Sequence, residues 1–64
     1  MTLNGEYFTL DSPSVLADVL ESHDFDVTRL AAELNGAIVP RAQYQDVIVT
    51  DADTLEVVTF VGGG

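Results

Sequence analysis

The chain has 64 residues, enough for one small domain but with little room for an internal active site. Eleven acidic residues against two arginines give a formal net charge of -9, which repels nucleic acid and anionic membrane surfaces. The lack of cysteine excludes disulfides and thiolate metal sites. No secretory signal or membrane-spanning run is visible, so we expect a cytoplasmic globular protein with no nucleic-acid or membrane partner.

The first predicted element is a β-hairpin. Asn4-Gly5 separates two short strand-like segments, and this dipeptide favours a type I′ turn because both central positions need positive φ. A helix of about three turns is expected next, with Asp11 or Ser12 as its N-cap and Pro13 near its first position. Its apolar stripe consists of Val15, Leu16, Val19 and Leu20.

The second half of the chain reads as short strands and turns. Leu30 to Leu34 is ambiguous by period, but Asn35-Gly36 follows at once, so we interpret a strand, a tight turn and a short strand at Ile38-Val39. The remaining predicted elements are a helical turn or loop over Pro40 to Tyr44 with Tyr44 against the core, a strand over Val47 to Val49, a turn over Asp51 to Asp53, and a last strand over Leu55 to Val61.

This order of elements predicts an α+β fold, with a mixed sheet of four to five strands packed on one main helix. A β-grasp arrangement satisfies it, with the first and last strands as central neighbours. We expect a β-grasp domain over residues 1–61 and a flexible C-terminal glycine tail over residues 62–64.

Few side chains outside the tail suggest chemistry. His23 is the only histidine and cannot build a metal site alone, so it receives no role. Asp51 and Asp53 lack the further acid and the glycine of a calcium loop, so a turn between strands explains them better. The serines and threonines lack a positioned base, which argues against hydrolysis. We expect no metal site and no bound cofactor.

The last strand is largely apolar on both faces. Alternation places one set of residues on one face and a second set on the other, namely Leu55, Val57, Thr59 and Val61 against Glu56, Val58 and Phe60. A single helix covers only one face, so the other face should meet solvent or a partner. We favour Val58 and Phe60 as exposed because Glu56 shares their side. With Val61 and Gly62 they form the predicted partner-binding surface.

The chain ends on three glycines, Gly62 to Gly64. Residues without Cβ can thread a narrow channel that any side chain would block. The terminal carboxylate is ionised at neutral pH and is a poor electrophile until something activates it. We interpret Gly64, preceded by Gly63, as the reacting end; the alternative is an inert, frayed terminus. The absence of lysine and cysteine leaves an activated terminus few nucleophiles on a second copy of the chain.

Four segments together resemble the ThiS family of sulfur carriers of thiamine biosynthesis: Leu3 to Glu6, Asn35 to Arg41, Asp51 to Asp53, and Phe60 to Gly64. The likeness spans essentially the whole chain. Family members more often have glycine in place of Ala52 and often tryptophan in place of Tyr44. Neither departure touches the tail.

The resemblance implies a ubiquitin-like β-grasp fold and a protein cosubstrate rather than an enzyme. It implies that a ThiF-type adenylating enzyme, using ATP and Mg, activates the carboxylate of Gly64. A sulfur-donor protein carrying a persulfide would then convert that group to a thiocarboxylate, and thiazole synthase would receive the sulfur. Gly63 and Gly64 match the family's essential pair.

Three alternatives stay open at this point. The small subunit of molybdopterin synthase uses the same terminal chemistry in another pathway, although its chains are usually longer. A ubiquitin-like modifier would join its tail to a lysine of a target protein. A binding module with an inert tail would need only the exposed apolar face.

Overall fold

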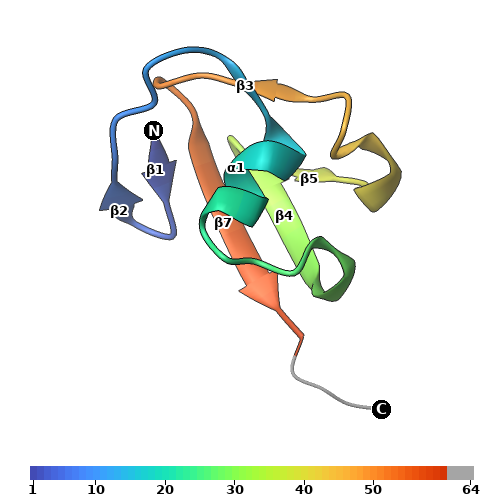
Figure 1. Ribbon diagram of the computed structural model, residues 1–64. Coiled ribbons are helices and arrows are strands. Elements are labelled where there is room, and N and C mark those ends of the chain that lie inside the picture. Colours follow the sequence, from blue (N-terminus) through green and yellow to red (C-terminus); the bar gives the residue numbers. More distant parts are fainter. Residues whose placement is uncertain (61–64) are drawn as a thin grey trace.

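The computed structural model describes residues 1–60, in which a five-stranded mixed sheet packs against one helix (Figure 1). The strand order is β2-β1-β7-β4-β5. Only β1 and β7 run parallel; the other neighbours are antiparallel. The bounds are Thr2–Leu3 for β1, Glu6–Tyr7 for β2, Leu30–Leu34 for β4, Ala37–Val39 for β5 and Thr54–Thr59 for β7. The predicted β-grasp arrangement, with the first and last strands as neighbours, is confirmed.

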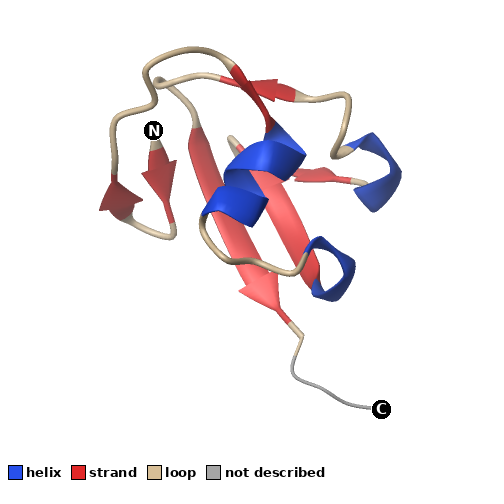
Figure 2. Ribbon diagram, viewed as in Figure 1, coloured by secondary structure: helices blue, strands red, loops and turns tan. Residues whose placement is uncertain are grey.

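A second, two-stranded sheet lies beside the first and consists of β3 (Ser14–Val15) and β6 (Ile48–Val49). Two short 3-10 turns, η1 (Val27–Arg29) and η2 (Arg41–Gln43), complete the elements (Figure 2). The predicted boundary after Val61 lies outside the described residues.

Both two-residue hairpin turns have the predicted backbone. Asn4 and Gly5 have φ of 50° and 84°, and Asn35 and Gly36 have φ of 52° and 85°. Asparagine and glycine tolerate this left-handed region because asparagine is short and polar and glycine has no Cβ. The turns therefore set the register of the β1–β2 and β4–β5 pairs.

The predicted start of the helix is wrong. Helix α1 spans Leu16–Ser22, about two turns, and begins after Val15 without a side-chain cap. Ser14 and Val15 are instead extended and pair with β6. The first amides of α1 find partners elsewhere, since Leu16 N donates to Val47 O at 2.8 Å and Ala17 N donates to Tyr44 O at 2.9 Å. Backbone carbonyls from a distant segment thus replace the cap that the sequence suggested.

Helix α1 ends at Ser22, and the chain turns through a left-handed residue just after it. Asp24 has φ of 65°, and its N–H donates to Glu21 O, while Phe25 N donates to Leu20 O. This double hydrogen bond is the Schellman motif, which usually places glycine at the left-handed position.

The core lies between α1 and one face of the large sheet. Figure 1 shows α1 crossing over β7 and β4. Tyr44 is buried, as predicted, and lies among the residues of this core: Met1, Leu3, Leu16, Ala17, Val19, Leu20, Leu30, Ala32, Val39, Val49, Leu55 and Val57. Within residues 1–60, no helix is long and apolar enough to cross a membrane.

Candidate functional site at the end of strand β7

Strand β7 leads directly to the glycine tail and is held from both sides. It pairs with β1 over Thr54 and Leu55 and with β4 over Leu55 to Thr59. After the strand ends, Phe60 N still donates to Arg29 O at 2.8 Å. The point at which the chain leaves the sheet is therefore fixed by backbone hydrogen bonds.

The predicted site residues fall into two groups. Val61, Gly62, Gly63 and Gly64 lie outside the described residues. Val58 and Phe60 are 63% and 55% exposed, whereas Leu55 and Val57 are buried. The prediction that Val58 and Phe60 are exposed is confirmed, but Thr59, which was expected on the covered face with Leu55 and Val57, is exposed as well. The partner-binding role of Val58 and Phe60 stays a prediction.

The exposed side of β7 continues across the neighbouring strands. In β4 the burial alternates: Ala31 and Glu33 are exposed, Leu30 and Ala32 are buried, and Leu34 is half-buried. The register pairs Ala31 with Val58 and Glu33 with Glu56, and on the other side pairs Glu33 with Ile38 of β5, which is 76% exposed. We call this side of the sheet the open face, formed by Ala31, Glu33, Ile38, Glu56, Val58 and Phe60.

Sequence reasoning missed three members of the open face, Ala31, Glu33 and Ile38. The sequence signal for these positions is the two-residue alternation between covered and exposed positions, which β4 shares with β7. In Leu30 to Leu34 this alternation is hard to recognise from the sequence, because two of the five residues are alanines and alanine fits either face. Pairing with β7 resolves which positions face solvent.

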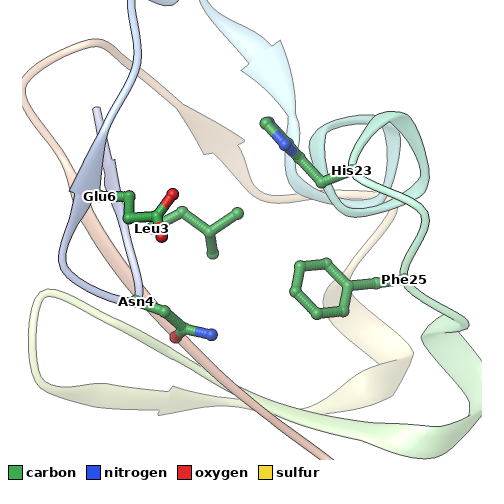
Figure 3. A pocket seen from close by; sticks show the side chains of 5 residues that line it. All are labelled: Leu3, Asn4, Glu6, His23 and Phe25. Atoms are coloured by element: carbon green, nitrogen blue, oxygen red, sulfur yellow. The ribbon is translucent and has the colours of Figure 1, made fainter.

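A shallow hollow of about 250 Å³ lies on the other side of the domain, between the first hairpin and the end of α1. Figure 3 shows Leu3, Asn4 and Glu6 on one wall and His23 and Phe25 on the other. The imidazole of His23 also packs on the ring of Phe8, with ring centroids 4.4 Å apart. The His23 ring thus packs on Phe8 and lines one wall of the hollow.

The perturbed carboxylates stabilise loops. Hydrogen bonds from Leu10 N, the amino group of Met1 and the Tyr7 hydroxyl lower the pKa of Asp51 to about 2. The Asn35 side-chain amide and Thr50 N lower the pKa of Asp53 in the same turn. Both acids precede β7, at the end opposite the tail. No group of three or more potential metal ligands gathers within the described residues.

This arrangement, an open sheet face beside a strand that delivers a glycine tail, defines a ubiquitin-like β-grasp domain. It matches the crystal structure of a thiamine biosynthesis protein (ThiS) from Geobacter metallireducens with a TM-score of 0.82 and 29% identity, covering 98% of this chain and 96% of that one. The chain belongs to the ThiS family, whose profile matches residues 1–64.

Sequence relatives agree with this assignment. The chain is 40% identical over 62 residues to the uncharacterised protein ycf40 of Pyropia yezoensis, covering 97% of this chain and 87% of that protein. It is 35% identical over 49 residues to the sulfur carrier protein ThiS of Bacillus subtilis, covering 77% and 74%. It is also 36% identical over 64 residues to a thiazole synthase of Paramagnetospirillum magneticum, covering all of this chain but 20% of that protein.

Proposed function

We propose that this protein is a sulfur carrier of thiamine biosynthesis that works through the carboxylate of Gly64. The observation that supports it most is the match to the ThiS family over residues 1–64, which include the glycines that follow β7. The match to a protein named as a sulfur carrier points to the same role. The chain is then a protein cosubstrate and not an enzyme.

In this proposal a ThiF-type adenylating enzyme binds ATP and Mg and transfers AMP to the Gly64 carboxylate, releasing pyrophosphate. The acyl group gains a good leaving group and accepts sulfur from the persulfide of a donor protein. AMP leaves as the terminal sulfur of the persulfide binds the acyl carbon, which gives an acyl disulfide between Gly64 and the donor cysteine. A thiol then attacks the donor sulfur of this disulfide, forms a new disulfide with the donor and releases the thiocarboxylate. The carrier supplies the carboxylate and the side-chain-free path that lets it reach a recessed site.

Thiazole synthase is the proposed acceptor of the sulfur. The support is the full-length likeness of this chain to one fifth of a protein named thiazole synthase, in which a domain of this kind is part of the same chain as the rest of that protein. The presence of a similar domain in the same chain as a protein named thiazole synthase favours a direct encounter between this protein and a separate thiazole synthase.

Intact mass spectrometry tests the chemistry. The protein is incubated with its host's activating enzyme, ATP, Mg and a sulfur donor, and the mass is compared with that of a reaction without ATP. A gain equal to one sulfur in place of one oxygen, mapped to Gly64, is expected. Deletion of Gly64, and Gly63→Ala, should keep the fold by circular dichroism but abolish this gain. Normal loading of either variant would contradict the mechanism.

A further inference from the structure

Both asparagines of the chain lie in the same tripeptide and in the same kind of turn. Leu3-Asn4-Gly5 joins β1 to β2, and Leu34-Asn35-Gly36 joins β4 to β5. The two asparagines have nearly the same φ angle, and so do the two glycines. Because the local sequence and the backbone are matched, a difference in reactivity between the two asparagines must come from the surroundings of their side chains.

An asparagine that precedes glycine can lose its side-chain amide in a reaction with its own backbone. The glycine nitrogen attacks Cγ of the asparagine and forms an N–Cγ bond, while the Cγ–Nδ2 bond breaks and ammonia leaves with the proton of the glycine amide. Glycine favours this attack because it has no Cβ to obstruct the approach. Water then opens the five-membered succinimide ring at one of its two carbonyl carbons, which gives aspartate or isoaspartate. The net change replaces NH2 by OH, and water is the only other reactant.

The carboxamide of Asn4 is held by the middle of β7. Its nitrogen donates to the carbonyl of Val57 and its oxygen accepts from the amide of the same residue, in two partly buried hydrogen bonds. Val57 is a buried core residue that pairs with Ala32 on its other side. Ring closure moves the carboxamide of Asn4 away from both partners and leaves partly buried backbone groups unpaired, which is costly. Asn4 therefore reacts only when the centre of the sheet opens, a rare event in the most stable part of a fold.

The carboxamide of Asn35 is held by exposed groups just before and at the start of β7. Its nitrogen donates to Oδ1 of Asp53 at 2.9 Å, and its oxygen accepts from the amide of Thr54 at 2.9 Å. Both hydrogen bonds are exposed to solvent, and one partner is a side chain that can rotate away. Water replaces the partners of exposed groups at low cost, so these bonds open while the rest of the domain stays folded.

We infer, independently of the proposed function, that Asn35 is a site of spontaneous deamidation in the folded protein and that the core protects Asn4. Either product adds a carboxylate to a chain that already carries a net charge of -9. In the aspartate product this carboxylate faces that of Asp53, and like charges at such short range repel. In the isoaspartate product the backbone gains one carbon, so the two-residue turn no longer fits the register of β4 and β5. Both products loosen the β4–β5 hairpin at the start of β7.

Peptide mapping of the wild type tests this inference without any substitution. The folded protein is incubated at mildly alkaline pH and sampled over time, and a second incubation contains denaturant. After pepsin digestion in acid, mass spectrometry measures the fraction of each asparagine in which OH has replaced NH2. An isoaspartyl methyltransferase, which methylates the isoaspartate carboxylate, identifies that product. The quantity compared is the protection of each site, the ratio of its rate in denaturant to its rate in the folded protein.

We expect the protection of Asn4 to exceed that of Asn35 by at least about tenfold, because only Asn4 depends on an opening of the core. Equal protection of the two sites, or stronger protection of Asn35, would overturn the inference. So would a folded protein in which neither site reacts while both react in denaturant.

The consequence for stability is tested with a preformed product and a matched background. Asn35→Asp should lower the melting temperature at neutral pH, because its carboxylate meets that of Asp53. In an Asp53→Asn background the same substitution should lower it less, since the facing charge is gone. An equal loss in both backgrounds would contradict the role given to the two carboxylates.

Discussion

The side-chain amide of Asn4 pairs with the backbone of Val57, 53 residues later in the chain. Its Nδ2 donates to Val57 O at 3.1 Å, and its Oδ1 accepts from Val57 N at 2.7 Å. Asn4 N also donates to Leu55 O at 2.9 Å. Strand β1 ends at Leu3, so the amide takes the place of a further strand residue and keeps β7 hydrogen-bonded on that side for one more step.

Replacement of Asn4 by glycine should destabilise the fold. Glycine accepts the φ of 50° at this position, so the variant loses the two side-chain hydrogen bonds without adding backbone strain. Chemical denaturation should show a loss of about 1 to 3 kcal/mol in the free energy of unfolding, since the partly buried backbone groups of Val57 lose their partner. Asn4→Asp keeps the acceptor oxygen but loses the donor N–H, so its free energy of unfolding should lie between those of the wild type and of Asn4→Gly. An unchanged midpoint for Asn4→Gly would show that the amide contributes nothing.

Asp24→Gly should stabilise the protein. Asp24 occupies the left-handed position of the Schellman motif and places a negative charge at the negative end of α1. Glycine removes both costs, and we expect a gain of roughly 0.5 to 1 kcal/mol in unfolding free energy. Asp24→Asn removes the charge and keeps a side chain, so it should gain only a few tenths of a kcal/mol. A less stable glycine variant would contradict this account.

Stability should fall when the pH drops from about 4 to about 2. The folded pKa of Asp51 is lowered to about 2 from 3.8, so the folded state favours the ionised carboxylate. Its contribution is present above the unfolded value and disappears as the pH falls through the folded value. Asp51→Asn should unfold at lower denaturant than the wild type at pH 7, and the two proteins should converge near pH 2. A constant difference between them across this range would argue against the linkage.

Most of the fold could be predicted from short sequence patterns. The two Asn-Gly pairs and the alternation in β7 have direct physical meanings that do not depend on distant residues. Both turns are confirmed, and so is the alternation from Leu55 to Val58, whereas Thr59 is exposed at the end of the strand. The start of α1 could not be predicted from local residues. Asp11, Ser12 and Pro13 form a good cap sequence, but pairing of Ser14 and Val15 with β6 holds the chain extended.

Only the β7 side of the open face could be predicted from the sequence, because the other members depend on pairing between strands that are distant in the chain. Val58 and Phe60 could be assigned to the exposed side because they share it with Glu56, and a charged residue is unusual on a covered face. The opposition of Glu33 and Glu56 depends on the register between β4 and β7, which are separated by 19 residues. Neither the propensities nor the periodicity of a single strand predicts its register with another strand. The pairing of the two glutamates is therefore known only from the structure.

Aspartate at Val58 or at Phe60 should weaken binding to the activating enzyme and leave the fold intact. Both side chains are exposed, so the free protein can accommodate the charge, whereas an apolar interface would bury it without a partner. We expect at least a tenfold rise in the dissociation constant, about 1.4 kcal/mol. Ile48→Asp is the matched control, because Ile48 is 53% exposed but lies on β6 of the small sheet. If all three variants bind the activating enzyme alike, the open face is not the docking surface. If only the Ile48 variant binds like the wild type, the activating enzyme contacts the open face.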